Sequence, residues 1–577
     1  MARTVQNERI RYLARALGGF PVAMNLVALL GLTAAIAAPE DLLGRGAALV
    51  TAALVVGRVA WQLVTDRRER VTDRLWIGNN VVARVALAGA ALVTGLAADL
   101  ESLWLVAATA IVMILLVGEQ SVRRPLGSAI PQAANLPGGE VEIPSLSLAR
   151  TIHMVNTGAA VLLAFSGAFG VTAVPALVAA VVGVGMTLLI GLQAVRFLVQ
   201  RRRFEKQLPT ILAELGPAFA FHWQAPAGTA YQAAMWLPYL ERLGVPYFVL
   251  VRTVANFTEV AKMTNAPVIL RVGLEDLDRV VTPSLRVVFY ANTAVRNSHM
   301  IRFPKLTHIQ LNHGDSDKIA SVSPTFRQYD RNFVAGQAAI DRFAVHGVQT
   351  LSEQFEIVGR PQLEDVEQAT APIASVERPV VLYSPTWSGF YDDSDYSSLP
   401  AGPEIVRILL ERGATVLFRP HPYARRHPGN TRACERVIAL LEADARTSGR
   451  AHVFGAAAES AMSVVDCFNA SDAMVSDVSS LASDYLMSGK PFAMAAVSKH
   501  GEEFAREFPL SRAAYVFDVR GKDPQGFAEL VEDMLGADSH GPTRASLRSY
   551  YLGDVEPGRV AERFLDTARR YVTAGTD

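Results

Sequence analysis

The chain has 577 residues, of which 50% are hydrophobic and 19% charged, and its 55 basic residues balance 55 acidic ones. This length predicts two to four domains, and without a basic excess there is no global electrostatic basis for binding nucleic acid. The two cysteines, Cys434 and Cys467, are far from any CxxC spacing, which excludes a cysteine zinc site and a disulfide framework.

Six apolar stretches follow one another in the first 200 residues, at 16–38, 46–64, 81–98, 103–117, 155–172 and 174–195. A helix needs about 20 apolar residues to cross the hydrocarbon core of a bilayer. We therefore expect a transmembrane domain of six helices over residues 1–206. Repetition of the apolar segments argues against a signal peptide. Arg58 and Arg84 lie near one end of their stretches, where we expect them to reach the headgroups.

Basic residues lie on every second connection between these stretches. They are Arg3, Arg9, Arg11 and Arg15 at the start, then Arg67, Arg68, Arg70 and Arg74, then Arg123, Arg124 and Arg150, and finally Arg196, Arg201, Arg202, Arg203 and Lys206. The positive-inside rule places these connections in the cytoplasm. We expect a multi-pass protein of the cell membrane, with both termini and everything after residue 206 in the cytoplasm. Polar residues within the spans are few (His153, Asn156, Gln193), which favours an anchor or lipid-handling scaffold over a transport pathway.

From about residue 210, short apolar runs alternate with helical windows, a pattern typical of parallel α/β sheets. We expect strands at 218–223, 247–251, 268–271, 287–290 and 308–311, then at 380–383, 414–418, 453–454, 473–475, 492–495 and 515–518. A helix is expected at 229–243 and a closing helix at 559–571. The joint near 369–379 divides two Rossmann-like halves, 207–370 and 371–577. Two such halves with a cleft between them commonly bind nucleotide sugars.

The pair His313-Gly314 follows the last strand of the first half. We expect Gly314 to turn the backbone sharply and leave the imidazole facing the cleft, where it is suited to removing a proton from a hydroxyl. Asp315 and Asp317 are candidates for orienting this histidine or binding a cation. A turn whose polar residues satisfy one another explains the same pattern.

Two further motifs follow strands of the second half, and two supporting motifs flank the interdomain joint. Arg419-Pro420-His421-Pro422 presents a planar donor fork and an imidazole on a stiff backbone, which suits a phosphate. Ser476–Ser480 precedes a helix, where hydroxyls and free N–H groups favour an anion. Each has a plainer interpretation, a proline-stiffened surface turn or an ordinary helix cap. The supporting motifs are Gly359-Arg360-Pro361 and Tyr383–Trp387.

Taken in order, these motifs resemble the CDP-glycerol glycerophosphotransferase family, whose members transfer or polymerise glycerol phosphate in teichoic acid synthesis. The resemblance covers roughly residues 300–500, with Lys490-Pro491 closing the helix after Ser480, and it does not cover the membrane domain. It implies a GT-B fold with two Rossmann-like halves, acceptor side first and nucleotide donor side second. The segment Asn312–Lys318 departs from the family's usual WHGTPLK, and Val478 replaces a usual tyrosine.

The resemblance also implies roles for individual residues. His313 is the general base for the acceptor hydroxyl, and His421 with Arg419 stabilises the leaving CMP. Donor phosphate and nucleotide contacts are implied for Arg419, Asp477, Ser479, Ser480 and Thr386. Orienting or acceptor-side candidates are Asp315, Asp317, Lys318 and Arg360. No metal or cofactor is implied, because histidine, arginine and a helix N-terminus suffice for phosphoryl transfer.

The sequence thus favours a membrane-anchored enzyme that moves glycerol phosphate, or a related polyol phosphate, from a CDP-activated donor to a lipid-linked or polymeric cell-envelope glycan. One alternative is an inverting glycosyltransferase of the same fold that uses a nucleotide sugar. A second is a transporter or export component with a degenerate transferase domain. No nucleic acid partner is expected, and the sequence leaves the polyol, the acceptor and the oligomeric state open.

Overall fold

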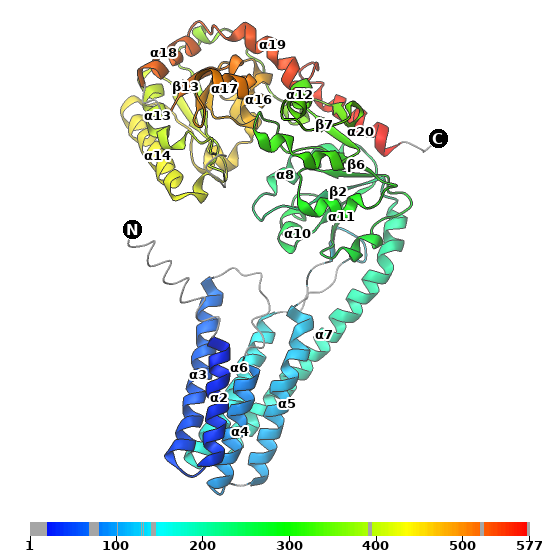
Figure 1. Ribbon diagram of the computed structural model, residues 1–577, viewed down its shortest axis with the longest axis vertical. Helices are drawn as coiled ribbons and strands as arrows, with labels where there is room; N and C mark the ends of the chain where they lie inside the picture. The colour runs from blue at the N-terminus through cyan, green and yellow to red at the C-terminus, as the bar shows by residue number, and fades with distance from the viewer. Residues whose placement is uncertain are drawn as a thin grey trace. The chain divides into compact units, whose positions relative to one another are not determined.

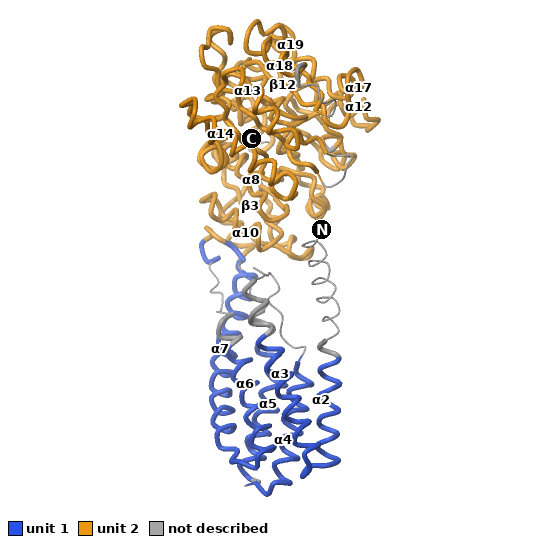
Figure 2. Tube along the Cα trace, turned by 90° about the vertical axis from the view of Figure 1, so that its left-hand side faces the viewer, with its two compact units in different colours: residues 1–133, 137–207 blue, residues 134–136, 208–577 orange. Residues whose placement is uncertain are grey.

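A computed structural model describes residues 20–68, 80–100, 102–127, 130, 132–139, 146–389, 395–519 and 524–573. The chain divides into two compact units (Figure 2). One comprises residues 1–133 and 137–207, and the other residues 134–136 and 208–577. The boundary falls within the long helix α7 (Val174–Leu215).

The described part of the first unit is a bundle of long helices (Figure 1), which are α2 (Phe20–Ala37), α3 (Leu42–Arg68), α4 (Val81–Ala97), α5 (Ser102–Gly127), α6 (Leu146–Phe169) and α7. Four of them, α3, α5, α6 and α7, contain stretches long and apolar enough to cross a membrane, whereas the apolar stretches of α2 and α4 are shorter. The length criterion is therefore met by four of the six expected spans. Small residues fill the interior: a Cβ on Gly167 of α6 would lie 2.5 Å from the Ala91 carbonyl oxygen of α4, and such contacts let helices approach closely.

The bundle encloses a charged cluster that corrects one expectation. Arg84 does not reach the headgroups, because its side chain is 1% exposed and its Nη1 donates to Glu119 Oε2 of α5 at 2.8 Å. Glu119 Oε1 lies 2.7 Å from His153 Nδ1 of α6, and Oε2 accepts from Asn156 Nδ2 at 3.3 Å. Between packed helices an arginine is stabilised by a carboxylate. Glu119 was not expected from the sequence, because it lies just past the apolar stretch 103–117.

Much of the charge pattern behind the predicted orientation lies outside the described residues. This applies to Arg3, Arg9, Arg11, Arg15, Arg70 and Arg74, and to the side chains of Arg67, Arg68, Arg123, Arg124 and Arg150. The orientation therefore stays a prediction.

The second unit contains two sheets. The first has the order β1-β4-β3-β2-β5-β6-β7-β8, with β1 (Ala133–Ala134), β2 (Phe219–Trp223), β3 (Tyr247–Val251), β4 (Val268–Leu270), β5 (Val287–Tyr290), β6 (Thr307–Gln310), β7 (Arg331–Val334) and β8 (Phe355–Ile357). The pairs from β4 to β8 are parallel. The apolar side chains of β2 to β7 are buried, as parallel strands covered by helices require, whereas those of the edge strand β8 are half-buried.

The second sheet has the order β10-β9-β11-β12-β13 and is also parallel. Its strands are β9 (Val380–Ser384), β10 (Thr415–Phe418), β11 (Ala473–Ser476), β12 (Phe492–Ala496) and β13 (Tyr515–Asp518). In each sheet the strands that follow the first long strand add on one side of it, and the later strands add on its other side. The strand order therefore reverses between β2 and β5 in the first sheet and between β9 and β11 in the second. Ligands of open α/β sheets bind at such reversal points, at the carboxyl ends of the strands.

Three local predictions were wrong. The strands β7 and β8 were not expected, because each is short and carries polar residues. The strand expected at 453–454 forms only a single bridge between Val453 and Leu417. The helix expected at 229–243 is broken into α8 (Tyr231–Ala234) and α9 (Leu237–Glu241), since Pro238 fits only the first turn of a new helix.

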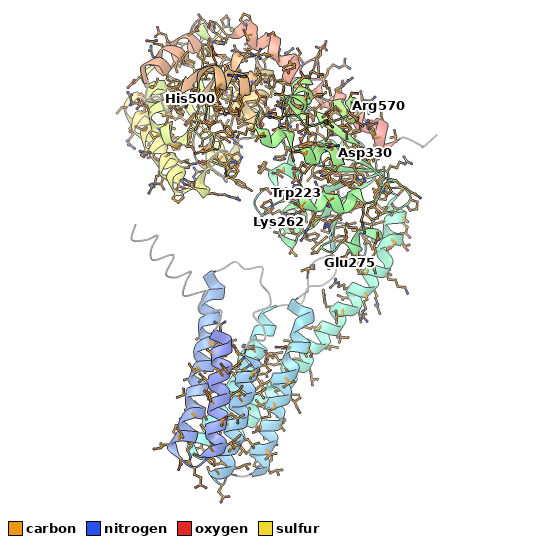
Figure 3. All side chains as sticks on the ribbon, in the orientation of Figure 1. Trp223, Lys262, Glu275, Asp330, His500 and Arg570 are labelled. Carbon is orange, nitrogen blue, oxygen red and sulfur yellow. The ribbon has the colours of Figure 1, made fainter. Side chains whose placement is uncertain are left out.

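The last helix, α20 (Val560–Val572), returns to the first half of this unit (Figure 1). Arg331 Nε of β7 donates to Tyr571 Oη at 2.9 Å, and Arg286 Nη1 donates to the Val572 carbonyl at 3.2 Å. Figure 3 labels Arg570, which lies on α20, and Asp330, which directly precedes β7. The joint near residue 371 therefore separates the two sheets. The helix α20 follows this joint in the sequence but packs on the half that comes before it.

Candidate active site

His313 lies just beyond β6, where the chain leaves the carboxyl edge of the first sheet. Its Nδ1 is 2.9 Å from the Ala291 carbonyl oxygen, which follows β5. Because a carbonyl only accepts, Nδ1 carries the proton and Nε2 holds the lone pair of the neutral ring. The side chain is open to solvent, yet the protein around it lowers its pKa by desolvation, with a smaller contribution from the charge of Arg360. This is the form that a general base needs at neutral pH.

The path of this segment differs from the expected one. Gly314 does not have a positive φ; Asn312 does, at +61°, and its carbonyl accepts from Trp236 Nε1 at 2.5 Å. Asparagine is among the residues that tolerate this left-handed conformation. Glycine is required at 314 for a different reason, because a Cβ there would lie 2.8 Å from Ser480 Oγ of the second half.

His421 belongs to the loop after β10. Its Nδ1 accepts from the Tyr423 backbone N–H at 3.0 Å, which leaves the proton of the neutral ring on Nε2. Trp387 stacks on the imidazole, with centroids 6.2 Å apart. Desolvation lowers the pKa of His421 to about 4, assisted by Lys318, Arg426 and His313. The segment that carries His313 adjoins the second half, because Gly314 faces Ser480, and the charge of His313 contributes to the lowered pKa of His421.

The loops after β9 and β11 are tied together by Asp477. Its Oδ2 accepts from the backbone N–H of Thr386 at 2.6 Å and of Ser398 at 3.2 Å. The carboxyl is fully buried, and desolvation raises its pKa to about 7. Asp477 thus shapes the loop that carries Thr386 through Oδ2, whereas its buried Oδ1 has no hydrogen-bond partner among the described residues.

Ser479 and Ser480 stand at the start of α16 (Ser480–Tyr485). Ser479 is the N-cap residue, but its side chain makes no cap hydrogen bond; its Oγ lies 3.2 Å from Ser476 Oγ. Plain side-chain capping therefore does not explain Ser479. Ser480 faces Gly314, so this loop adjoins the His313 segment.

Arg419 is turned into the second half. Its Nη1 donates to the carbonyl oxygens of Ala458 and Met462, the latter at 2.8 Å. This nitrogen is occupied by backbone acceptors, so a phosphate role for Arg419 stays a prediction for its other nitrogens.

The acidic and basic candidates on the first half join it to the second. Asp317 is buried and accepts from Arg342 Nη1 at 2.9 Å, Tyr551 Oη at 2.9 Å and the Leu510 N–H at 3.1 Å. Asp315 also pairs with Arg342. Within the described ranges, the contacts of these two carboxylates are with these groups and not with His313. Desolvation raises the pKa of Asp317 to about 6.

Arg360 forms a buried two-bond pair across the halves. Its Nε and Nη2 donate to the two carboxylate oxygens of Asp484 of α16, each at 3.0 Å. Arg360 was expected at the site from the sequence, whereas its partner Asp484 was not, and neither were Arg342 and Tyr551. Their signal was weak, because each lies on a helix whose remaining residues look ordinary.

Lys318 reaches the second half. Its Nζ is 3.4 Å from Thr386 Oγ1 and 5.0 Å from the centroid of the Tyr396 ring. Desolvation lowers its pKa to about 8, against the charges of Asp477 and Asp395.

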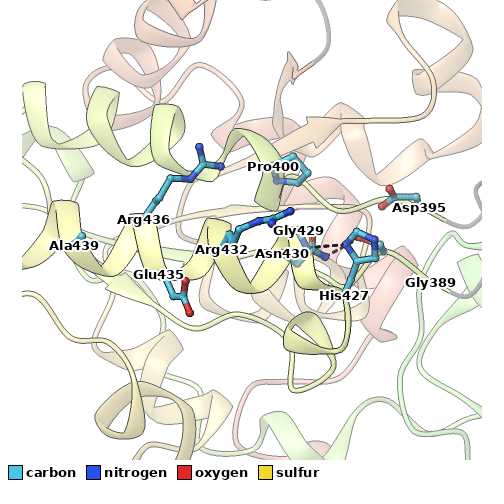
Figure 4. Close-up of a pocket in the computed structure, with 11 residues that line it drawn as sticks. Gly389, Asp395, Pro400, His427, Gly429, Asn430, Arg432, Glu435, Arg436 and Ala439 are labelled. Carbon is cyan, nitrogen blue, oxygen red and sulfur yellow. Dashed lines mark hydrogen bonds between the residues drawn. The ribbon is translucent and has the colours of Figure 1, made fainter. Parts of the chain in front are cut away.

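A pocket of about 850 Å³ lies beside the loop after β9 (Figure 4). Its polar lining residues are Ser388, Asp395, His427, Asn430, Arg432, Glu435 and Arg436. Asn430 Nδ2 donates to Ser388 Oγ at 2.8 Å, which ties α14 (Pro428–Ser448) to the segment following Trp387. In the described parts of the chain, no group of three His, Cys, Asp or Glu side chains is placed to hold a metal ion.

Two parallel α/β sheets with facing strand-end loops define a GT-B-like transferase. Residues 362–568 match the family described as CDP-Glycerol:Poly(glycerophosphate) glycerophosphotransferase. This region of the chain is similar to that family, and the chain is a CDP-glycerol glycerophosphotransferase-like enzyme.

Solved structures with a similar chain path share little sequence with it. A putative UDP-N-acetylglucosamine 2-epimerase from Listeria monocytogenes is 11% identical, with a TM-score of 0.43 over 63% of this chain and 98% of its own. The S. aureus MnaA–UDP complex is 13% identical, with a TM-score of 0.42 over 62% and 98%. A variant of the wall teichoic acid polymerase TagF with CDPG is 12% identical, with a TM-score of 0.42 over 66% and 96%. No curated protein sequence matches the chain.

Proposed function

We propose that this protein is a membrane-anchored transferase that moves glycerol phosphate from CDP-glycerol to a hydroxyl of a lipid-linked or polymeric cell-envelope glycan and releases CMP. One observation carries the proposal. Two neutral histidines stand on strand-end loops of opposite halves, one with its lone pair on Nε2 and the other with its proton on Nε2. Such a pair supplies a base for the acceptor and a donor for the leaving group.

In this reaction the acceptor oxygen forms a bond to the β-phosphorus of CDP-glycerol. The bond from that phosphorus to the bridging oxygen breaks, and the bridging oxygen leaves with CMP. The acceptor proton passes to His313 Nε2, while His421 Nε2–H donates to the departing phosphate. Positioning and charge stabilisation account for most catalysis of phosphoryl transfer, so no covalent intermediate on the protein is needed.

The donor is proposed to bind on the second half, where the family match lies. Ser479, Ser480 and Thr386 line its phosphates, and Asp477 holds the Thr386 backbone in place. The pocket beside Ser388 and Asp395 continues from this loop and has room for the nucleoside. Arg360, Asp315 and Asp317 hold the two halves in register.

The membrane unit is proposed to cross the bilayer six times, with both termini and the transferase in the cytoplasm. The support is the arginine-rich alternate connections together with four helices of sufficient length. This arrangement would present the transferase to an acceptor whose lipid end stays in the cytoplasmic leaflet.

The donor is tested with purified full-length protein in detergent and a panel of CDP-glycerol, CDP-ribitol, UDP-glucose and UDP-N-acetylglucosamine. We expect nucleotide release from a CDP-polyol in the presence of acceptor, and CMP as the product. Release of UDP from a nucleotide sugar, with none from the CDP-polyols, would favour the glycosyltransferase alternative.

A further inference from the structure

The donor site as described lacks an assigned cation. A donor diphosphate carries two negative charges, and enzymes stabilise transferring phosphoryl groups with Arg or Lys clamps. Arg419 commits Nη1 to the carbonyl oxygens of Ala458 and Met462. Arg426 lies over the Tyr423 ring, 3.3 Å from its centroid. Arg426 also acts on His421, but Lys318 acts on it more strongly.

Lys318 is the first of the charged groups that act on His421. It lies five residues after His313 on the first half, and its Nζ approaches Thr386 Oγ1 of the second half at 3.4 Å. An ammonium group has three donors. In the described residues no carboxylate lies within ion-pair distance of Nζ, and the Thr386 contact is long. Donors of Lys318 therefore remain for a ligand.

The other groups facing Lys318 come from the second half. They are Asp477, Asp395, His421, Thr386 and the ring of Tyr396. Asp477 is a weak counter-ion, because burial raises its pKa to about 7 and its Oδ2 is occupied by two backbone N–H groups. A half-buried cation with incomplete compensation is stabilised by an arriving anion.

We propose that Lys318 binds the diphosphate of the donor, so that the acceptor half supplies the cation that holds the nucleotide on the opposite half. This inference rests on the proposed function. Lys318 Nζ and His421 Nε2–H approach the same phosphates from the two sides of the cleft, and Lys318 keeps its proton throughout. Donor binding then bridges the halves at the position where His313 receives the acceptor.

The test is calorimetry on the full-length protein with CDP, CMP and cytidine. Lys318→Met should weaken CDP binding 10- to 100-fold and leave cytidine binding within twofold, because only the phosphates contact the ammonium. Lys318→Arg should recover at least a third of the lost affinity on a logarithmic scale. The matched control is Lys305→Met, which removes an exposed lysine of the same half and should leave all three affinities unchanged.

A pH series separates binding from a structural role. Because the pKa of Lys318 lies at about 8, wild-type affinity for CDP should fall between pH 7.5 and about 9.5, whereas Lys318→Arg, which stays charged, should hold its affinity. Unchanged CDP affinity in Lys318→Met, or an equal loss for CDP and cytidine, would overturn the inference while leaving the proposed function intact. A wild-type protein that binds neither CDP nor CMP would overturn the proposed function itself.

Discussion

Gly314 and Ser480 are in contact across the two halves of the transferase unit, so closely that a methyl group on Gly314 would lie 2.8 Å from Ser480 Oγ and 3.1 Å from its Cβ. The contact joins the residue after His313 to the first residue of α16. It fixes how near the acceptor side and the phosphate loop can come.

Gly314→Ala should push these segments apart by several tenths of an ångström and lower turnover about 10- to 100-fold, since small misplacements of reacting groups are costly in rate. Ser480→Gly removes the clashing atoms together with a hydroxyl proposed to line the donor phosphates, so the matched reference for the double variant is Ser480→Gly alone. In that background Gly314→Ala should cost less than about threefold in the single-turnover rate with CDP-glycerol. A loss as large as in the wild-type background would show that the contact with Ser480 is not the cause.

His313→Ala should lower turnover about 10²- to 10⁴-fold if the imidazole is the base. Because desolvation lowers the pKa of His313, the wild-type rate should fall only as pH drops below the ordinary histidine range, where Nε2 becomes protonated. The pH dependence of kcat/KM measures this limb. A near-normal rate in His313→Ala would remove this residue from the mechanism.

His421→Ala should also slow turnover about 10²- to 10⁴-fold, and it should weaken CMP binding more than His313→Ala does. The reason is that the Nε2–H of His421 is proposed to face the leaving phosphate. Calorimetry with CMP on both variants compares them, and equal CMP affinities would contradict the assignment.

Asp477→Asn tests the buried carboxyl through stability. In the folded protein the pKa of Asp477 is about 7, above the ordinary value of 3.8. Ionisation of this carboxyl therefore favours the unfolded chain, so the wild-type protein is most stable below about pH 4 and loses stability as pH rises through 7. The amide keeps an acceptor for Thr386 and Ser398 without the charge. Asp477→Asn should therefore be more stable than wild type by about 1–3 kcal/mol at pH 8, with no difference near pH 4, in thermal unfolding. A variant less stable than wild type at pH 8 would mean that the ionised form is the one the fold requires.

In the membrane unit, Glu119→Ala should destabilise the bundle by about 3–5 kcal/mol, because it leaves Arg84 buried without its carboxylate. Glu119→Ala combined with Arg84→Met should recover much of that loss. Thermal unfolding in detergent compares the two variants with wild type. Equal stability of Glu119→Ala and wild type would show that Arg84 finds another partner.

Strands with continuous apolar runs, such as β3 and β12, were predictable because burial on both faces dictates their composition. The polar short strands β7 and β8 were not, since only their neighbours stabilise them. At the site, His313 and His421 followed from their position after strands. The side chains that join the halves did not: Asp317 with Tyr551, and Arg360 with Asp484, lie 234 and 124 residues apart, and no local pattern connects them. The orientation of Arg419 likewise depends on carbonyls of a distant loop.

Transfer of glycerol phosphate can be followed with CDP-glycerol labelled at the β-phosphate, full-length protein and a lipid-linked glycan acceptor. We expect the label to move to the acceptor and unlabelled CMP to be released in equal amount, with both lost in His313→Ala. Label that remains in a released nucleoside diphosphate would mean that the carbon–oxygen bond is broken instead, as in a glycosyltransferase, and that glycerol phosphate is not the group transferred.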